Sequence, residues 1–408
     1  MKILLINHYA GSVRHGMEYR PHYMAREWVL SGHTVRVVAA SRSHVRSIQP
    51  EFVGRRHEEN VDGVDYLWYR TPAYQGNGAG RALNIAAFCT QLMWDARWLA
   101  RESKPDVVVA SSTYPMDIWP AHRIAQLCSA KLVHEVHDLW PLSPMELNGM
   151  SARHPFIAVC QMAEDFACRR ANVVVSMLPK VEDHMAARGL DLSKLHIVPN
   201  GVSNEDWDNV NETFAPEIAR YIQQAQGEGR LVVVYAGAHG LANALDSLLD
   251  AAAILLSDRF SFILIGGGPE RERLQQRVAS EGLHNVAMFG PIPKRQIPPM
   301  LAAVDMAYIG LQRAPLFRFG IAPNKLMDYM MAGCVVLSAI EAGNDPVAEA
   351  GCGVSVQAES APAIAQGLRK IASIDPISRR QMGLRGRSYI QEHHTWPVLA
   401  KRFIEAVS

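Results

Sequence analysis

The residues best suited to chemistry lie in one stretch late in the chain, Phe317–Gly333, where a loop containing glycine and proline runs into a short predicted helix. Pro323 suits a helix start, because its missing N–H would have no partner there. The unpaired N–H groups of a first helical turn carry partial positive charge, and Lys325 adds a formal one. Asp328 follows one turn later, on the same face as Asn324. These groups suit the phosphates and ribose of a nucleotide diphosphate; a helix cap with a solvated Lys–Asp pair is the alternative.

Two glycine-rich turns, Gly237–Gly240 and Gly266–Gly268, each fall between a predicted strand and a predicted helix. Such turns are common in α/β folds, so each one alone is weak evidence. Together with Phe317–Asp328 they place three loops suited to a ligand at one end of one parallel sheet. We therefore expect a nucleotide-linked molecule to bind at this end.

The first half of the chain has polar strand ends of its own. Glu135–Asp138 ends a predicted strand, which places His137 and Asp138 where parallel sheets commonly carry active-site residues. His137 suits proton transfer or donation to a substrate oxygen, and a structural hydrogen bond is the alternative. Gly16 follows the first strand, Lys2–Asn7, without the spacing of a dinucleotide-binding fingerprint. It permits either the close approach of a ligand or a simple turn.

Strands alternate with helices throughout, which predicts an α/β fold with mostly parallel sheets. At 408 residues the chain is too long for one ordinary core. We expect a Rossmann-like domain over 1–203, a polar linker over 204–229 and a second Rossmann-like domain over 230–391. The C-terminal helix, 392–408, is expected to pack back onto the first domain.

Composition excludes several other classes of protein. Hydrophobic residues make up 49% of the chain and charged residues 20%, and no apolar run is long enough to span a membrane. The first residues suit a buried strand and not a signal peptide. Six cysteines without a CxxC pair argue against a disulfide framework or a zinc site and fit a reducing cytoplasm. A net charge of +1 gives no reason to expect a nucleic acid as partner.

Two features of the sequence could allow contact with a membrane or a partner protein. Residues 14–56 hold eight arginines against three glutamates, and a predicted helix over Arg81–Arg101 is rich in aromatic and apolar side chains. A basic patch and a helix that faces a membrane or a partner are one interpretation. An ordinary solvated surface and a helix that faces the core are the other.

The order and spacing of these motifs resemble the family-4 glycosyltransferases of the GT-B fold, and within them the WbuB-like branch. The resemblance implies two Rossmann-like domains that face each other across a cleft. It also implies sugar transfer from a nucleotide donor, with retention at the anomeric carbon and with neither metal nor other cofactor. The matching segments are Lys2–Asn7, Gly16–Pro21, Gly32–Val35, Pro105–Val108, Glu135–Pro141, Pro199–Val202, Tyr235–Gly240, Gly266–Glu270, Asp305 and Ala322–Gly333.

The resemblance assigns roles to individual positions. Asp328 corresponds to the second acid of the family's E-x7-E motif, which holds ribose hydroxyls. Gly320 stands where the first acid is expected, and the backbone N–H groups of Phe319–Ala322 are the candidate replacement. Lys325 is the candidate for neutralising the diphosphate, and His137 corresponds to a residue near the donor sugar.

The expected site residues form three groups. Those expected to be catalytic are His137, Lys325 and Asp328. Those expected to bind the donor are Gly16, His239, Gly240, Gly267, Pro291, Ile292, Gly320, Ile321, Ala322, Asn324, Lys325 and Asp328. Those expected on the acceptor side are Arg20, Ser43, His44, Arg46 and Asp138. No metal site is expected, because the D-x-D sequence Asp206–Asp208 falls in the predicted linker.

The expected function is retaining, metal-independent transfer of an N-acetylated hexosamine or deoxyhexosamine. The donor would be a UDP-sugar, and the acceptor a polyprenyl-diphosphate-linked saccharide in bacterial surface-polysaccharide assembly, such as that of O-antigen. The protein would then be cytoplasmic, with peripheral contact to the inner membrane. Two alternatives remain open. One is a nucleotide-sugar 2-epimerase of the same architecture, and the other, suggested by the missing first acid, is a nucleotide-binding protein without catalysis.

Overall fold

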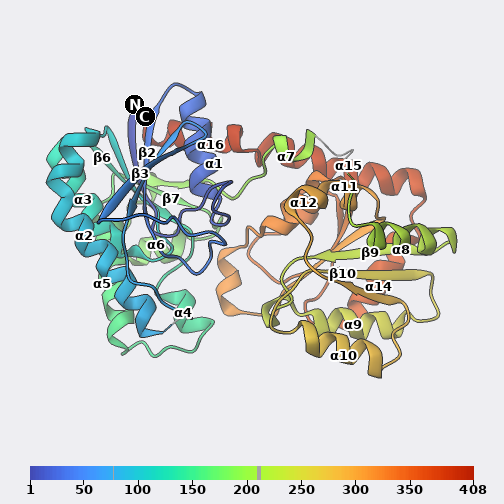
Figure 1. The fold of residues 1–408 in the computed structure, drawn as a ribbon. Helices are drawn as coiled ribbons and strands as arrows, with labels where there is room; N and C mark the ends of the chain where they lie inside the picture. Colours follow the sequence, from blue (N-terminus) through green and yellow to red (C-terminus); the bar gives the residue numbers. More distant parts are fainter. Residues whose placement is uncertain (77, 209–212) are drawn as a thin grey trace. The chain divides into compact units, whose positions relative to one another are not determined.

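A computed structural model describes residues 1–76, 78–208 and 213–408 of the chain. The chain forms two compact units (Figure 1). Unit 1 comprises Met1–Asn200 together with Trp396–Ser408, and unit 2 comprises Gly201–Thr395. Each unit is a parallel or mostly parallel sheet covered by helices on both faces, so the predicted pair of Rossmann-like α/β domains with mostly parallel sheets is confirmed.

Unit 1 is built on a sheet with the strand order β3-β4-β2-β1-β5-β6-β7-β8, in which every neighbouring pair is parallel except β3 and β4. The strands are β1 (Lys2–Ile6), β2 (Thr34–Ala40), β3 (Arg56–Val61), β4 (Val64–Tyr69), β5 (Val107–Ala110), β6 (Lys131–Val136), β7 (Val173–Ser176) and β8 (Leu195–Ile197). Its helices are α1 (Arg20–Leu30), α2 (Ala79–Ser103), α3 (Ile118–Cys128), α4 (Leu142–Glu146), α5 (Pro155–Arg170), α6 (Glu182–Ala187) and α16 (Trp396–Val407), with short 3-10 turns η1 (Pro115–Asp117) and η2 (Leu192–Lys194).

The central strand β1 shows why this sheet needs helices on both faces. Its side chains alternate, so that Ile3 and Leu5 enter one core while Leu4 and Ile6 enter the other. Helices α1 and α16 cover the first core, and α2, α3 and α5 cover the second.

Unit 2 has an entirely parallel sheet with the strand order β11-β10-β9-β12-β13-β14. The strands are β9 (Leu231–Ala236), β10 (Phe260–Ile265), β11 (Val286–Phe289), β12 (Met306–Gly310), β13 (Val335–Ala339) and β14 (Gly353–Ser355). The helices are α7 (Glu205–Asp208), α8 (Pro216–Gly227), α9 (Leu245–Ile254), α10 (Arg271–Ser280), α11 (Ile297–Ala302), α12 (Asn324–Met331), α13 (Pro346–Ala350), α14 (Ala361–Ala372) and α15 (Pro376–His393), with 3-10 turns η3 (Leu241–Asn243), η4 (Lys294–Gln296) and η5 (Pro315–Phe319).

The structure differs from the predicted linker over 204–229. Helix α8 belongs to unit 2, because Ile218, Ile222 and Ala225 repeat at helical spacing and are buried in its core. Residues 209–212 of the predicted linker lie outside the described residues.

The C-terminal helix packs within unit 1, but it starts later than the predicted 392. It begins at Trp396, whereas residues up to His393 continue α15 of unit 2. The Trp396 ring stacks on Tyr23 of α1 with centroids 5.5 Å apart, and the Trp28 indole N–H donates to the Ala400 carbonyl at 3.3 Å. Among the described residues, no helix combines the length and the apolarity that a membrane crossing requires.

Candidate functional site

A pocket of about 270 Å³ opens at the carboxyl ends of β9 and β10 in unit 2. Open parallel sheets commonly bind ligands at this end. Its lining combines backbone from both glycine turns, Pro291 and Ile292 from the loop after β11, and Lys325 and Asp328 from α12. The predicted donor-binding residues that the structure brings together here are therefore Gly267, Pro291, Ile292, Lys325 and Asp328.

The two glycine turns form the floor of this pocket by packing backbone against backbone. The Gly237 N–H donates to the Ile265 carbonyl at 2.9 Å, and the His239 N–H donates to the Gly267 carbonyl at 2.8 Å. A Cβ added at Gly266 would lie 1.9 Å from the Gly237 carbonyl oxygen, so a side chain there would break the contact. The glycines thus allow the strands to end close together, with backbone exposed to a ligand.

Helix α12 holds Lys325 and Asp328 in place through its opposite face. Leu326, Met327 and Met330 are buried in the core of unit 2. The Tyr329 hydroxyl accepts from the Ala236 N–H at 2.8 Å and donates to the Ala236 carbonyl at 3.1 Å, which fixes the helix to the end of β9. The helix start expected at Pro323 is observed, with Pro323 in the N-cap position.

Lys325 lies over the first glycine turn with only neutral partners. Its Nζ donates to the Tyr235 hydroxyl at 3.0 Å and to the Asn243 side-chain oxygen, and it lies 4.8 Å from the centroid of the Tyr235 ring. No carboxylate among the described residues pairs with it. Burial lowers the pKa of Lys325 to about 8. The pocket therefore contains a positioned cation without a built-in counter-ion.

Asp328 is half-buried one helical turn further on. Burial raises the pKa of its carboxyl to about 7, Lys294 acts in the opposite direction, and Asp206 adds to the rise. The carboxyl makes no hydrogen bond among the described residues. A carboxyl group of this kind can accept a hydrogen bond from a ligand hydroxyl.

The remaining predicted donor-binding residues of unit 2 lie outside the described lining of this pocket. Asn324 is exposed at the start of α12. His239 is fully buried, neither of its ring nitrogens has a hydrogen-bond partner among the described residues, and burial, Arg271 and Lys325 together lower its pKa. Gly240 precedes the short turn η3. Ala322 follows the loop that holds Gly320 and Ile321.

The proposed backbone replacement for the missing first acid is only partly possible. The Gly320 N–H donates to the Phe317 carbonyl at 2.9 Å, and the Ile321 N–H donates to the Asn344 side-chain oxygen at 2.8 Å. Asn344 also donates back to the Ile321 carbonyl at 3.1 Å. These two N–H groups of Phe319–Ala322 already have partners within the protein, Phe317 and Asn344, so we correct the expectation that they face a donor sugar.

In unit 1, the ends of β5 and β6 bring together Ser111, Glu135 and His137. The His137 Nε2 lies 3.0 Å from the Ser111 Oγ and 3.2 Å from a Glu135 carboxylate oxygen, and the Ser111 hydroxyl donates to the same carboxylate. Burial alone would raise the pKa of Glu135, but Arg20, His137 and Ser111 hold it well below its usual range. Glu135 therefore stays ionised and orients the His137 ring, a role that the sequence analysis did not assign to Glu135.

Arg20 and Arg46, both predicted to bind the acceptor, are structural in this fold. Arg20 is 2% exposed and donates to Glu135 at 2.8 and 3.1 Å, to the Val198 carbonyl at 2.9 Å and to the Pro199 carbonyl at 2.6 Å. Arg46 is 4% exposed and donates to the carbonyls of Ala10 and Ala40. We correct both predictions, because these guanidinium groups are used to cap strand ends and are shielded from any acceptor.

The other predicted residues of unit 1 have different surroundings. Ser43 is buried in its loop, whereas His44 and Asp138 are exposed. The Nδ1 of His44 lies 2.8 Å from the Tyr74 hydroxyl. Gly16, predicted to bind the donor, has a φ of 82° and closes a tight turn, with its N–H donating to the Ser12 carbonyl at 2.9 Å.

Comparison with known families gives the class of the protein. Residues 15–201 match the family described as glycosyl transferase 4-like domain, and residues 230–373 match the family described as glycosyl transferases group 1. The chain therefore carries two glycosyltransferase domains, one matched in each unit.

Individual relatives are distant but span most of the chain. WcaI of Escherichia coli (strain K12), which carries the name of a colanic acid biosynthesis glycosyl transferase, is 21% identical over 359 residues, covering 84% of this chain and 86% of its own. WbjE of Pseudomonas aeruginosa, named as a glycosyltransferase, is 20% identical over 326 residues, covering 79% of each chain.

Solved structures show the same fold at similar distance. Sucrose-phosphate synthase from Thermosynechococcus elongatus superposes with a TM-score of 0.73 at 15% identity, covering 99% of this chain and 98% of its own. Anabaena HepE in complex with UDP and glucose gives a TM-score of 0.66 at 15% identity, covering 99% of each chain. At these identities the likeness establishes the architecture, and the chemistry has to be argued from the site.

Proposed function

We propose that this protein is a retaining, metal-independent glycosyltransferase that takes its sugar from a UDP-linked donor held in the unit-2 pocket. Lys325 carries the proposal, because a cation fixed by neutral partners beside exposed glycine backbone is suited to a diphosphate. A nucleoside diphosphate leaves readily once its developing negative charge is offset, and Lys325 would supply that offset. The proposal that the configuration at the anomeric carbon is retained rests on the resemblance to the family-4 glycosyltransferases.

The donor assignment draws on the rest of the pocket. Asp328, Pro291 and Ile292 line the pocket, and in this proposal Asp328 receives the ribose hydroxyls while Pro291 and Ile292 pack against the base. HepE is described in complex with UDP and glucose, which favours UDP as the nucleotide. We propose an N-acetylated hexosamine or deoxyhexosamine as the sugar, in keeping with the resemblance to the WbuB-like branch.

The acceptor assignment draws on the relatives. WcaI is named for colanic acid biosynthesis, and WaaG, which superposes with a TM-score of 0.63, is described as involved in lipopolysaccharide biosynthesis. We propose a polyprenyl-diphosphate-linked saccharide as acceptor, in surface-polysaccharide assembly such as that of O-antigen. The protein would act in the cytoplasm, in peripheral contact with the inner membrane.

In unit 1, His137 is the proposed catalytic residue. Glu135 and Ser111 fix its ring through the Nε2 contacts, which would leave the other ring nitrogen for a substrate oxygen. A Ser111→Ala variant should therefore lower turnover more than donor affinity.

Calorimetric titration with UDP, GDP and dTDP tests the donor assignment. UDP should bind most tightly and raise the melting temperature by mass action. Lys325→Met should lose about tenfold or more in UDP affinity, because a hydrogen bond to a charged group contributes about 1.5–3 kcal/mol. Lys370→Met, at an exposed lysine of α14, is the matched control and should bind UDP normally. Unchanged affinity in Lys325→Met would remove the lysine from the site.

The two alternatives give different results in one further experiment. The protein is incubated with a UDP-N-acetylhexosamine, with and without a lipid-linked saccharide, and the sugar is followed by NMR. Formation of an epimer without acceptor would identify a nucleotide-sugar 2-epimerase. The missing acid at Gly320 favours a nucleotide-binding protein without catalysis, and UDP-sugar binding with neither transfer nor epimerisation would support that reading.

A further inference from the structure

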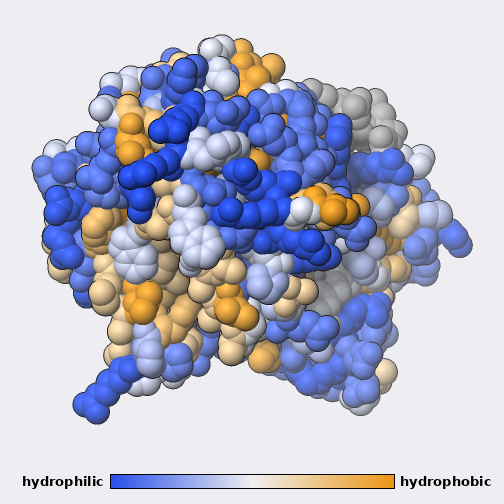
Figure 2. All heavy atoms as spheres, turned by 60° about the vertical axis from the view of Figure 1, so that its left-hand side comes forward, coloured by the Kyte–Doolittle hydropathy of each residue, from blue (hydrophilic) through white to orange (hydrophobic). Residues whose placement is uncertain are grey.

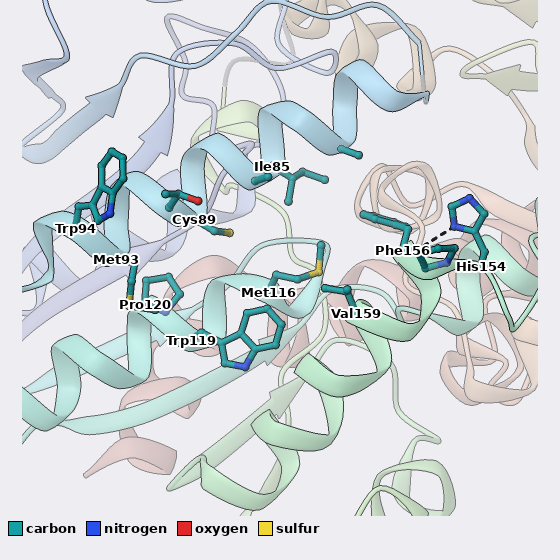
Figure 3. Close-up of a pocket in the computed structure, with 14 residues that line it drawn as sticks. Ile85, Cys89, Met93, Trp94, Met116, Trp119, Pro120, His154, Phe156 and Val159 are labelled. Atoms are coloured by element: carbon teal, nitrogen blue, oxygen red, sulfur yellow. Dashed lines mark hydrogen bonds between the residues drawn. The ribbon is translucent and has the colours of Figure 1, made fainter.

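Each unit contains a further pocket outside the sites described above, and the two pockets differ in chemistry. That of unit 1, of about 660 Å³, lies between α2, α3 and α5, where Trp94 and Met93 descend from α2 toward Trp119 (Figure 3). The described residues that line it include no Asp, Glu, Lys or Arg, and Figure 2 shows apolar side chains gathered over the helices of unit 1 on its left-hand side. Such a surface suits the peripheral membrane contact that the proposed function already includes. The pocket of unit 2 is lined by charged side chains, and the proposed function does not use it.

The pocket of unit 2 lies at the amino ends of β12 and β13 and has a volume of about 480 Å³, within the range of small-molecule sites. Its walls are the end of α11, the turn that follows α12 and one face of α15. The donor pocket opens at the carboxyl ends of β9 and β10 in the same parallel sheet, so the two pockets lie at opposite edges of that sheet. A ligand here would therefore take no direct part in sugar transfer.

Glycines allow α15 to lie close against the turn that follows α12. A Cβ added at Gly383 would lie 1.9 Å from the Gly333 carbonyl oxygen, and one added at Gly386 would lie 2.8 Å from the Cβ of Cys352. This close approach fixes which face of α15 borders the pocket. The bordering positions repeat at helical spacing; they are Pro376, Arg379, Arg380, Leu384 and Arg387.

The three arginines of this face have no counter-ion. No carboxylate among the described residues forms an ion pair with Arg379, Arg380 or Arg387, and the hydrogen bond described for them joins the Arg379 Nη1 to the Ile374 carbonyl at 3.5 Å. Grouped like charges repel each other. Because α15 begins at Pro376, the positive end of its dipole also opposes cations at its fourth and fifth residues. The arginine cluster therefore adds no stability of its own and is suited to an anion.

Asp305, just before β12, contributes an acceptor to the same pocket. Its Oδ2 accepts from the Val232 N–H at 2.9 Å and from the Gln226 side chain at 3.2 Å, so the carboxylate is held in place. Its Oδ1 has no hydrogen bond among the described residues, and Asp305 forms no described ion pair with the arginines. The pocket thus offers cations along α15 and a free acceptor oxygen near the start of β12.

We propose that this pocket binds a small phosphorylated sugar that is not the nucleotide-linked donor. Planar guanidinium groups bind phosphate oxygens through paired hydrogen bonds, so the α15 arginines would hold the phosphate. The Oδ1 of Asp305 would accept from a sugar hydroxyl. This inference goes beyond the proposed function, because neither UDP nor the transfer reaction enters it.

The lining favours this ligand over two others. An inorganic anion could pair with the arginines, but it would leave the Asp305 oxygen without a partner and most of the 480 Å³ empty of ligand. A hydrocarbon chain would have to lie against four charged side chains, three arginines and one aspartate, which lose hydration without gaining a partner. A sugar phosphate supplies both an anion and hydroxyl donors.

Calorimetric titration with glucose 6-phosphate as the probe tests the proposal. The wild type should bind it, and Lys325→Met should bind it equally, because that lysine belongs to the donor pocket. Arg380→Gln combined with Arg387→Gln should weaken binding by about tenfold or more, since charged hydrogen bonds are lost. Inorganic phosphate should bind the wild type about fivefold more weakly than glucose 6-phosphate, because it lacks the hydroxyl for Asp305. Arg220→Gln, at an exposed arginine of α8 outside the lining, is the matched control and should bind normally.

Measurements without the probe keep folding and donor binding separate from this site. Arg380→Gln/Arg387→Gln should unfold at the wild-type temperature or above it and bind UDP normally, and Arg380→Gln alone repeats the test at an exposed position if the double variant fails to fold. Any one of four results would overturn the proposal: no glucose 6-phosphate binding by the wild type, loss of that binding in Lys325→Met, unchanged binding in the folded arginine variant, or equally tight binding of inorganic phosphate. A wild type that binds glucose 6-phosphate and not UDP would count against the donor assignment alone.

Discussion

Arg20 in unit 1 and Lys325 in unit 2 are both basic residues that the sequence predicts to meet a substrate. Their surroundings differ. Arg20 is 2% exposed and forms a salt bridge with Glu135 at 2.8 Å, with two backbone carbonyls as further partners. Lys325 is half-buried beside a pocket, and its described hydrogen-bond partners are a phenol and an amide.

The partners of a buried cation decide what it can do. A guanidinium with its own carboxylate is neutralised within the fold, and removing either member leaves a buried charge alone. An ammonium that is held only by neutral groups remains available to neutralise a ligand. Because burial removes water from the ammonium, its pKa is lowered. Structural and ligand-binding cations can therefore be distinguished by their counter-ions, and each expectation below tests that distinction.

The largest effect is expected from breaking the unit-1 pair. Arg20→Met should reduce the free energy of unfolding by roughly 3–5 kcal/mol, because Glu135 would be left buried without its counter-charge. Chemical denaturation followed by circular dichroism measures this. The double variant Arg20→Met/Glu135→Met should recover part of the loss, since it contains no lone buried charge. If Arg20→Met were as stable as the wild type, the pair would not be structural.

Removing the unit-2 cation should affect function and leave the fold intact. Lys325→Met should lower turnover by about 10²–10³-fold, by analogy with the loss of one group that stabilises charge in a transition state. The free energy of unfolding should stay the same or rise, because a buried ammonium without a carboxylate is removed. Sugar transfer under saturating donor and denaturation of the same sample make the contrast with Arg20→Met direct. Destabilisation comparable to that of Arg20→Met would erase the distinction between the two cations.

Much of the fold could be predicted from the sequence, because its pattern is local. Apolar strands such as Lys2–Ile6 and glycine turns such as Gly266–Gly268 repeat at the spacing that parallel sheets require, and they occur where expected. The short helix after Pro323 was predictable for the same reason. The predicted linker failed because polar composition concealed the buried face of α8, formed by Ile218, Ile222 and Ala225.

The candidate site could be predicted only for residues that are close in sequence, because one helix or turn then sets their relative positions. Lys325 and Asp328 share one face of a helix, so their joint presence in the pocket follows from spacing. Arg20 and its partner Glu135 are 115 residues apart, and no local pattern reveals that they meet. Likewise, the use of the Ile321 N–H depends on Asn344, which is 23 residues away.

The pH dependence of UDP affinity should report the protonation of Lys325. Its pKa is about 8 in the free protein, and a bound diphosphate would raise it, so affinity should fall above about pH 8 by up to tenfold per pH unit. The diphosphate is ionised throughout this range, and Lys325→Met should show no such slope. A wild-type affinity that stays level between about pH 8 and pH 10 would contradict the assignment.

Without ligand, the pH dependence of stability should have the opposite sign to the pH dependence of UDP affinity. Burial lowers the folded-state pKa of Lys325 from 10.5 to about 8, so the unfolded chain holds one more proton between these values. The contribution of Lys325 to stability therefore rises with pH in that window. Thermal unfolding of the wild type and of Lys325→Met without ligand, compared across the same pH range, isolates this contribution.

The smallest effect is expected at Asp328, where two carboxyls can be compared in the same terms. Glu135 forms hydrogen bonds with Arg20, Ser111 and His137, and these partners hold its pKa low. In contrast, burial raises the pKa of Asp328 to about 7, and the Asp328 carboxyl has no described hydrogen bond. If the ribose hydroxyls supply the missing partner, UDP should bind about fivefold more tightly than 2′-deoxy-UDP, as expected for one net hydrogen bond. Asp328→Ala should abolish that preference while leaving 2′-deoxy-UDP affinity nearly unchanged. Equal binding of the two nucleotides by the wild type would mean that Asp328, like Glu135, serves the fold and not the ligand.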